Sequence, residues 1–440
     1  MKVLFLCGGI GKRMFPITED KFLLKFLGKT LLEHQIEMAK QAGLTEFVVV
    51  GNPQNMSRIE EIVTRIPDIK VEVAVQEQPF GIANALESAS RLLDTEIIVV
   101  NPNDVFESSA YTKLLEVHQD NPAISYLLGY EVSDYFPGGY LVVGEEGELT
   151  HIVEKPEKGK EPSNLVNILI HLHTDPQRLL KYAASVETDR DDVYECALDA
   201  MARDTSKVKV VPYTDSWAAI KYPWHIFTAV RHFLDQSQQY ISPSAKISER
   251  AVIEGKVLIG DNVRVFENAV VRGPVYIGPN SVIGNNSLVR EYSHIGSDCV
   301  VGYSTEVKGS YVGDGCWFHM SYIGDSIIGE ACSFGANTVL ANWRFDEKNI
   351  SVRIESKAID SGRDKFGAII GNNCKTGVNV SIMPGIRIGP NSIVGSHVSL
   401  TEDLKPDRMA VAKSARKTIR NPFKVKQETA QKASERMRGL

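Results

Sequence analysis

The 440-residue chain has no apolar run that approaches the ~20 residues a membrane-spanning helix requires. Its N-terminal apolar run, residues 3–7, is too short for a secretory signal and meets glycines at once. Both absences argue against a membrane or secreted protein. We therefore expect a cytoplasmic protein with no membrane among its partners.

Cysteine is scarce, and its spacing excludes two further classes. The six cysteines stand at positions 7, 196, 299, 316, 332 and 374, and no two form a Cys-x-x-Cys pair. A zinc knuckle is therefore not expected, and a disulfide framework is unusual in a chain of this length.

An overall excess of positive charge is also missing. The chain has 49 Lys and Arg against 55 Asp and Glu, a net charge of −6. Residues 405–440 hold 11 Lys and Arg against 3 Asp and Glu, so this tail carries +8 and the remainder −14. Such an acidic body argues against nucleic acid as a partner. The basic tail fits either a solvated helix or a segment that holds an anion.

Glycine is rare in the first part of the chain and frequent in the second. Residues 1–240 contain 13 of the 34 glycines, whereas residues 241–404 contain 20. This difference predicts two architectures. We expect an α/β domain over residues 1–235, a second domain over 236–404 and a basic tail over 405–440.

The first part alternates strand-like and helix-like segments. Apolar or alternating runs at 2–7, 46–50, 70–75 and 96–100 predict strands, and periodic segments at 31–42 and 82–93 predict helices. This alternation indicates a largely parallel sheet. Residues 224–239 predict a helix that connects the two domains.

From Ile241 onward the sequence repeats every six residues. Twelve successive positions from Ile241 to Val307 are Ile or Val, and a small residue follows four positions later in eleven cases. After a phase shift near Val312 and an interruption over 343–368, the repeat resumes at Ile370 and runs to Leu400. A fixed short period predicts a solenoid. Three hexads per turn make a three-sided coil of eight turns.

Two features of this repeat have structural interpretations. Glycines at the second hexad position are expected at corners with unusual backbone dihedrals; they are Gly260, Gly278, Gly284, Gly296 and Gly302. Four cysteines fall on the small inward position, which predicts core packing; they are Cys299, Cys316, Cys332 and Cys374.

Cations recur at one corner of the predicted coil. Arg272, Arg290 and Lys308 are spaced by 18 residues, one turn of the coil, and would stack. Stacked cations repel one another unless an anion lies across them, so the pattern favours a phosphate or nucleotide site over solvated surface charge. His319 follows where the repeat changes phase, and Asn342 leads into the interruption.

A second group of motifs follows the strands of the first domain. Gly8, Gly9 and Gly11 follow the first strand, and their spacing fits neither a Rossmann nor a Walker A loop. Such backbone amides can hold phosphates, with Arg13 and Lys21 supplying positive charge. Gln76, before Gly81, could read a base edge, and Asp104 ends a β-branched run where a magnesium ligand is common.

The repeat and the segment around His319 resemble the acetyltransferase half of bifunctional sugar-1-phosphate nucleotidylyltransferase/amino-sugar-1-phosphate acetyltransferases, the archaeal type most closely. The resemblance covers nearly the whole chain. It implies a left-handed parallel β-helix of hexapeptide repeats and a homotrimer. It further implies that His319 is the general base that takes a proton as the sugar amine attacks acetyl-CoA. The other residues it implies for this site are Arg290 and Lys308 on the sugar phosphate, with Tyr322, Asn342, Lys348 and Lys365.

The first domain resembles the sugar nucleotidyltransferases, with an α/β Rossmann-like nucleotidyltransferase fold. The implied reaction is attack of a sugar-1-phosphate on the α-phosphate of UTP or dTTP, assisted by Mg²⁺ at Asp104. The remaining site residues implied are Gly8, Gly9, Gly11, Arg13, Lys21, Gln76, Gly81, Glu154, Lys155 and Asn167. Arg13, Lys21, His319 and Asn342 are expected to be catalytic.

The chain departs from the family pattern at several positions. Lys12 and Ile82 replace threonines, Asp20 replaces the proline before Lys21, and Val378 replaces a serine near the thioester. Ala219 stands where the family has a second metal ligand, and alanine cannot bind Mg²⁺. Three hypotheses therefore remain: a bifunctional enzyme, an acetyltransferase whose first domain binds nucleotide without turnover, and a non-catalytic assembly subunit.

Overall fold

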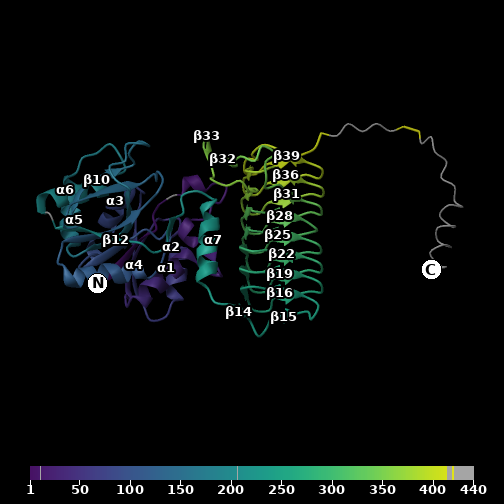
Figure 1. Cartoon of the computed structure of the whole chain (residues 1–440), viewed down its shortest axis with the longest axis horizontal. Coiled ribbons are helices and arrows are strands. Elements are labelled where there is room, and N and C mark those ends of the chain that lie inside the picture. The colour runs from purple at the N-terminus through teal and green to yellow at the C-terminus, as the bar shows by residue number, and fades with distance from the viewer. Residues whose placement is uncertain (10, 206, 414–418, 421–440) are drawn as a thin grey trace.

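The computed structural model describes residues 1–440 except 10, 206, 414–418 and 421–440. An α/β domain is followed by helix α7 (His225–Gln236), and then by a tall three-sided coil of short strands (Figure 1). Within the described residues, no helix combines the length and apolarity needed to cross a membrane.

The first domain is built on a nine-stranded sheet of mixed direction. Its central strands β1 (Lys2–Leu6), β4 (Glu46–Gly51), β5 (Lys70–Val75) and β6 (Ile97–Val100) pair in parallel, as the apolar runs predict. Strand β11 (Leu165–His173) pairs antiparallel with β6, and β9 (Gly139–Val143) and β10 (Leu149–Glu154) continue that side. Strands β8 (Ser125–Glu131) and β12 (Val208–Tyr213) complete the sheet. The expected largely parallel sheet is thus only half parallel, because β11 runs antiparallel to β6, β8 and β9, and β10 runs antiparallel to β9.

Helices cover this sheet and bury its apolar side chains. Helix α1 begins with a capping box in which Thr30 and Glu33 each accept from the other's backbone amide. The helices are α1 (Leu31–Gln41), α2 (Met56–Thr64), α3 (Gly81–Ser88), α4 (Ser109–Asp120), α5 (Pro176–Ser185) and α6 (Val193–Thr205). Single turns of 3-10 helix cover Lys12–Met14, Lys21–Leu23 and Ser90–Leu92.

Two short two-stranded ladders flank the main sheet. Strand β7 (Asp104–Phe106) pairs antiparallel with β13 (Trp217–Ala219), which places Ala219 directly opposite Asp104. Strands β2 (Lys25–Phe26) and β3 (Lys29–Thr30) form a small hairpin.

The second part is a parallel β-helix with three sheets, as the six-residue repeat predicts. The first sheet stacks β14 (Tyr240–Ile241), β17 (Val257–Ile259), β20 (Val275–Ile277), β23 (Ser293–Ile295), β26 (Tyr311–Val312), β29 (Ile327–Ile328), β34 (Ile369–Ile370) and β37 (Arg387–Ile388). The second stacks β15 (Lys246–Ile247), β18 (Arg264–Val265), β21 (Val282–Ile283), β24 (Val300–Val301), β27 (Trp317–Phe318), β30 (Ser333–Phe334), β35 (Lys375–Thr376), β38 (Ile393–Val394) and β40 (Met409–Ala410). The third stacks β16 (Val252–Glu254), β19 (Val270–Arg272), β22 (Leu288–Val289), β25 (Glu306–Lys308), β28 (Tyr322–Gly324), β31 (Val339–Leu340), β36 (Ser381–Ile382) and β39 (Ser399–Leu400).

The coil therefore extends to β40, inside the segment expected to be the basic tail. Most of that tail lies outside the described residues. The interruption of the repeat forms a hairpin of β32 (Ser351–Ile354) and β33 (Lys357–Asp360). Its base is closed by the Phe366 amide, which donates to the Asn342 carbonyl at 2.9 Å.

The corners of the coil correct one expectation. The left-handed conformation falls on asparagines such as Asn262 (φ +56°) and Asn280 (φ +60°), not on the second-position glycines. Those glycines are needed for space: an ideal Cβ on Gly278 would lie 2.6 Å from the backbone of Gly296 in the next turn. The stacked turns leave no room for a side chain at this position.

The aliphatic residues of the repeat fill the centre of the coil. Cys299, Cys316, Cys332 and Cys374 lie in this core, are at most 3% exposed and are free thiols. Their predicted packing role matches these positions.

The two parts share a hydrophobic core around α7. Phe26 is fully buried there, with its ring 5.3 Å from Phe233 and 5.9 Å from Tyr311. The Leu27 amide donates to His294 Nε2 at 3.1 Å, and Lys25 pairs with Asp314 at 2.6 Å. The coil is thus packed against the first domain instead of being tethered to it.

Candidate functional site

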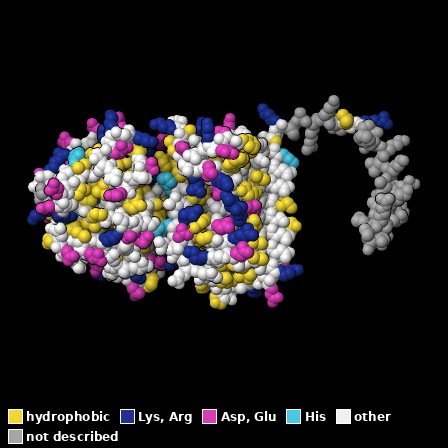
Figure 2. Space-filling model, in the orientation of Figure 1, with side chains coloured by type: hydrophobic (Ala, Val, Ile, Leu, Met, Phe, Trp, Pro, Cys, Tyr) yellow, Lys and Arg dark blue, Asp and Glu magenta, His cyan; other side chains and the backbone are white. Residues whose placement is uncertain are grey.

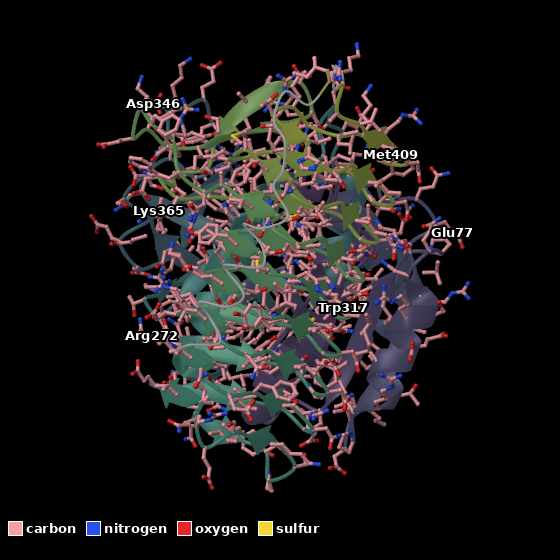
Figure 3. The ribbon with its side chains drawn as sticks, turned by 90° about the vertical axis from the view of Figure 1, so that its right-hand side faces the viewer. Glu77, Arg272, Trp317, Asp346, Lys365 and Met409 are labelled. Atoms are coloured by element: carbon pink, nitrogen blue, oxygen red, sulfur yellow. The ribbon has the colours of Figure 1, made fainter. Side chains whose placement is uncertain are left out.

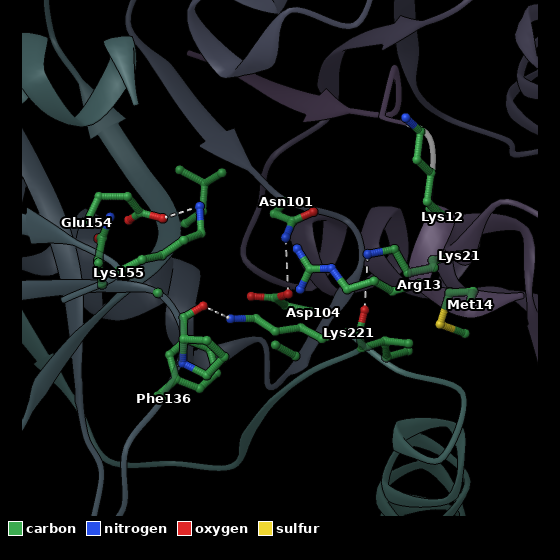
Figure 4. Close-up of a pocket in the computed structure, with 18 of the residues that line it drawn as sticks. Lys12, Arg13, Met14, Lys21, Asn101, Asp104, Phe136, Glu154, Lys155 and Lys221 are labelled. Atoms are coloured by element: carbon green, nitrogen blue, oxygen red, sulfur yellow. Dashed lines mark hydrogen bonds and ion pairs between the residues drawn. The ribbon is translucent and has the colours of Figure 1, made fainter. Parts of the chain in front are cut away.

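A cleft in the first domain lies beyond the carboxyl ends of β1 and β6, where α/β sheets bind ligands. It has two cavities of about 460 and 450 Å³, which share Lys12, Asn101 and Leu169. We call them the Asp104 cavity and the Gln76 cavity after one residue that lines each. Figure 4 shows the charged side chains of the Asp104 cavity.

The Gln76 cavity collects the residue expected to read the base and two glycines expected to hold phosphates. It is lined by Gly8, Gly9, Gln76 and Gly81. The Gln76 amide donates to the Gly81 carbonyl at 3.0 Å and to Asn84 at 2.9 Å. An ideal Cβ on Gly8 would lie 2.1 Å from Gln76 Oε1, so only glycine leaves this amide in place.

The Asp104 cavity collects the remaining residues predicted for this domain. These are Gly11, Arg13, Lys21, Asp104, Glu154, Lys155 and Asn167. Glu154 and Lys155 form an ion pair at 2.7 Å. The sequence therefore brings together, in one cleft, motifs that are separated by more than 150 positions.

Asp104 is the most buried carboxyl of this cavity. Its Oδ1 accepts from Asn101 Nδ2 and its Oδ2 from Trp217 Nε1, each at 3.1 Å. Burial raises the pKa of Asp104 to about 6, although the Trp217 bond and the charges of Lys221 and Lys21 lower it. At neutral pH the carboxyl is therefore mostly ionised.

Two lysines flank Asp104. Lys21 Nζ donates to the Ile220 carbonyl at 3.1 Å, and Lys221 Nζ donates to the Pro137 carbonyl at 2.6 Å (Figure 4). Burial lowers the pKa of both amines; the charge of Asp104 opposes this effect, and the pKa of Lys221 is about 8. The Lys221 ammonium also lies 3.5 Å from the centre of the Phe136 ring.

Several lining residues were not predicted from the sequence, among them Lys221, Trp217 and Glu195. Lys221 and Trp217 flank Ala219. The departure of this segment from the family pattern could therefore have indicated that both residues belong to the site. Glu195 lies in α6 among ordinary helical residues and gave no signal. Burial and then the nearby charge of Glu154 raise the pKa of Glu195 to about 8.

A buried relay orients Asn167. His171 Nε2 lies 2.8 Å from Asn167 Oδ1, and its Nδ1 lies 2.8 Å from the Tyr194 hydroxyl. The same hydroxyl contacts His173 Nε2 at 2.9 Å, and Ser125 closes the chain at 2.7 Å from His173 Nδ1. Burial lowers the pKa of both histidines, so the relay is neutral.

The residues around Asp104 do not form a metal-binding set. Among the described residues there is no group of three or more His, Cys, Asp or Glu suited to a metal ion. Ala219 offers no ligand opposite Asp104, and both Asp104 oxygens already accept hydrogen bonds. The magnesium ion expected here therefore has a single carboxylate, faced by lysines.

In the β-helix, four side chains form a hydrogen-bonded cluster on the third sheet. Lys308 pairs with Asp325 at 2.6 Å, and Asn342 Nδ2 donates to Asp325 at 2.5 Å. Asn342 also donates to the Tyr322 hydroxyl at 3.2 Å. The structure thus joins Lys308, Tyr322 and Asn342, which were predicted together, and adds Asp325. Lys308 and Asp325 also line a cavity of about 290 Å³ beside α7.

The cation ladder is present, and each member has a carboxylate partner. Arg272 pairs with Glu254 at 3.1 Å, and Arg290 pairs with Glu306 at 3.1 Å. The stacked cations are therefore stabilised within the chain, and their spacing alone does not require a bound anion. Figure 2 shows Lys and Arg side chains gathered in a band over the face of the coil on which Figure 1 labels β19, β22 and β25.

His319 lies at another corner of the coil. It is exposed, and its ring stacks on Trp317 at 5.2 Å. In Figure 3, Trp317 lies well apart from Arg272 and Lys365, which share one side of the coil. Lys348 and Lys365 are exposed on the interruption. His319 does not line the cavity beside Lys308 and α7, nor either cavity of the first domain.

The hairpin of the interruption also reaches the first domain. Ile350, Val352 and Ile354 pack in the shared core, and Glu355 at the hairpin tip lines the Asp104 cavity. The segment expected at the acetyltransferase site thus contacts both sites.

Comparison with known proteins agrees with this arrangement. The family model of nucleotidyl transferases matches residues 2–220, and the model of the bacterial transferase hexapeptide (six repeats) matches residues 256–291 and 367–402. The fold and the cleft therefore define a nucleotidyl transferase domain joined to a hexapeptide-repeat transferase domain.

Relatives with both domains cover nearly the whole chain. The bifunctional protein GlmU of Methanococcus maripaludis (strain C7) is 38% identical over 419 residues, 94% of this chain and 98% of that protein. A bifunctional sugar-1-phosphate nucleotidylyltransferase/acetyltransferase of Sulfurisphaera tokodaii is 33% identical over 92% of this chain and 100% of its own length. The chain belongs to this family of bifunctional sugar-1-phosphate nucleotidylyltransferase/acetyltransferases, which confirms the resemblance seen in the sequence.

A solved UDP-glucose pyrophosphorylase in complex with UDP-glucose is 20% identical, with a TM-score of 0.48. It covers 54% of this chain and 99% of its own chain.

Proposed function

We propose that the chain makes an activated N-acetylamino sugar through two reactions. The β-helix transfers acetyl from acetyl-CoA to an amino-sugar-1-phosphate. The first domain then transfers a nucleotidyl group from UTP or dTTP to the sugar-1-phosphate and releases pyrophosphate. The observation that best supports this proposal is that all eleven residues predicted for the first domain line one cleft. Family membership supports both activities.

In the nucleotidyl reaction, the two cavities have separate roles. Gln76 and the glycines beside it hold the base and the adjoining phosphates, while Asn167, Glu154 and Lys155 hold the sugar-1-phosphate. Arg13, Lys12 and Lys21 neutralise charge that builds on the α-phosphate and on the departing pyrophosphate. Mg²⁺ would supply the same neutralisation. Because the residues around Asp104 offer the ion only one carboxylate and several nearby lysines, no step is assigned to it.

In the acetyl reaction, His319 takes a proton from the sugar amine as the amine nitrogen attacks the thioester carbonyl. The new C–N bond replaces the C–S bond, and coenzyme A leaves as a thiol after its sulfur takes up a proton. Arg290 and Lys308 hold the sugar phosphate, and the Asp325 carboxylate keeps Lys308 and Asn342 in position. Tyr322 is held by the same cluster, and Lys348 and Lys365 extend from the interruption toward the substrates.

A homotrimer completes this second site. Because His319 and the Lys308 cluster lie apart in one chain, a neighbouring copy must bring them together. Large apolar side chains exposed near His319 support such an interface; they are Tyr303, Trp317, Met320, Val339 and Val378. We assign residues 1–235 to the nucleotidyl reaction, residues 236–404 together with strand β40 to the acetyl reaction, and the rest of residues 405–440 to a basic tail. We also assign the protein to the cytoplasm.

The alternative is an acetyltransferase whose first domain binds nucleotide without turnover. Ala219, opposite Asp104, favours it, because the site lacks a second carboxylate.

Product analysis separates these functions. Purified protein is incubated with glucosamine-1-phosphate, acetyl-CoA, Mg²⁺ and each nucleoside triphosphate, and products are identified by mass spectrometry. We expect both acetylated sugar phosphate and nucleotide sugar. Acetylated product alone would establish the alternative, and neither product, across several sugar phosphates, would favour an assembly role.

His319→Ala tests the separation of the two sites. We expect it to lower acetyl transfer by at least about 100-fold, the usual contribution of a general base, and to leave nucleotidyl transfer intact. His118→Ala is the matched control, because His118 lies in α4 and lines neither cavity of the cleft. Loss of both activities in His319→Ala would contradict separate sites.

A further inference from the structure

Asp104 lies in a cavity that is also lined by several positively charged side chains. The charges of Lys21 and Lys221 both act on the Asp104 carboxylate, and the charge of Arg13 acts on both lysines. Three cationic side chains thus line the cavity beside this carboxylate. A divalent ion placed beside this carboxylate would be repelled by all three.

The strand pairing explains why Lys221 is placed here. Ala219 lies opposite Asp104 in the β7–β13 ladder, where facing side chains have Cβ atoms roughly 5 Å apart. The methyl group of Ala219 leaves this space open. Lys221 follows two residues later, and its backbone amide donates to His225 Nδ1 at 3.1 Å, which fixes the turn after β13.

The Lys221 ammonium is held but not saturated. It donates to the Pro137 carbonyl at 2.6 Å and rests over the Phe136 ring. An ammonium has three donors, so two remain after the Pro137 bond. No carboxylate of the described residues lies within ion-pair distance of Lys221, whereas Lys155 in the same cavity is paired with Glu154.

We propose that Lys221 takes the place of a divalent cation in this cavity, lying between Asp104 and the phosphates of the nucleoside triphosphate, so that nucleotide binding does not need a metal. The inference rests on the proposed nucleotide site and adds the cation that serves it. A lysine can neutralise phosphate charge as a metal ion does, and it stays in the cleft when the nucleotide leaves.

Calorimetric titration of the full-length protein with UTP and with dTTP tests the inference, in EDTA and in excess MgCl₂. We expect the Kd of the better nucleotide to differ by less than about threefold between the two conditions, under 1 kcal/mol. We expect Lys221→Met to weaken binding in EDTA by about tenfold or more, as the loss of a charged phosphate contact does. Lys113→Met is the matched control, because Lys113 also lies over a ring, Tyr213, and pairs with Asp215 outside the cavity.

The double variant Ala219→Asp/Lys221→Met supplies the reciprocal test. It places a second carboxylate opposite Asp104 and removes the ammonium, so it should bind Mn²⁺ in electron paramagnetic resonance titrations where the native protein does not. Nucleotide binding by the native protein that requires Mg²⁺, or binding in EDTA that is unchanged in Lys221→Met, would overturn the inference alone. Absence of nucleotide binding under both conditions would overturn the proposed nucleotide site as well.

Discussion

The pKa of the Glu195 carboxyl is raised further than that of Asp104, the other buried acid of the Asp104 cavity. Burial disfavours its charged form, and Glu154 adds repulsion, so its pKa rises to about 8 from an ordinary value near 4.5. At neutral pH Glu195 is therefore mostly protonated and can donate a hydrogen bond to a sugar hydroxyl. This property comes from the environment, which no residue pattern in α6 records.

The pH dependence of stability should report this group. Because the folded protein holds the Glu195 proton more tightly than the unfolded chain, its contribution is full below pH 4.5 and is lost as pH rises through 8. Glu195→Gln should remove about 2 kcal/mol of the stability loss between pH 6 and pH 8. Chemical denaturation at both pH values measures this difference.

Glu116→Gln is the control, because Glu116 is an exposed carboxylate in α4. Equal pH dependence in the native protein and in Glu195→Gln would show that Glu195 is ionised in the folded state.

At the scale of elements, the corners of the coil use two residue types for two physical reasons. Gly278 gives close approach between turns, and Asn280 adopts the left-handed conformation. Gly278→Ala should therefore destabilise the β-helix by about 2 kcal/mol, as overpacking does. Asn280→Gly should change stability by less than about 1 kcal/mol, since glycine adopts the same φ without strain.

Thermal unfolding followed by circular dichroism compares these two corner variants directly. A Gly278→Ala melting temperature equal to that of the native protein would mean that the stacked turns separate at little cost.

The strands and the core of the coil could be predicted because a six-residue period fixes which side chains point inward. Ile241 to Val307 predicted the strands, and the inward cysteines predicted the core. The reason for each corner glycine could not be predicted. Sequence spacing shows where a residue lies on the coil, but it does not show how closely the backbone of the next turn approaches.

The candidate site was predictable where a motif follows a strand, as at Gly8, Asp104 and Glu154. Lys221 was missed because its role depends on Ala219 lying opposite Asp104 in the β7–β13 ladder, and these two residues are 115 positions apart in the sequence. The antiparallel pairing of β11 with β6 was missed for a related reason, since an apolar run predicts a strand but not the direction of its neighbour in the sheet.

At the scale of the whole molecule, the shared core around α7 couples the two domains. Phe26→Ala should lower stability by about 3–5 kcal/mol, the usual cost of truncating a buried phenylalanine. Because Phe26 contacts both Phe233 and Tyr311, we expect the first domain to unfold separately from the coil in this variant. Differential scanning calorimetry detects this as a change from overlapping to resolved transitions.

Phe80→Ala is the control, because Phe80 is 70% exposed and lies outside this core. If Phe26→Ala lowers stability without resolving the transitions, the coupling must come from other contacts, such as the pair of Lys25 with Asp314.

The hairpin that interrupts the repeat also constrains how this chain can diverge. Its base is at Asn342, in the Lys308 cluster, and its tip places Glu355 in the Asp104 cavity. A mutation that lengthens or shortens it is therefore subject to selection from both chemistries at once. Descendants that specialise in one reaction should be free to lose this hairpin, whereas those that retain both should inherit it with its length unchanged.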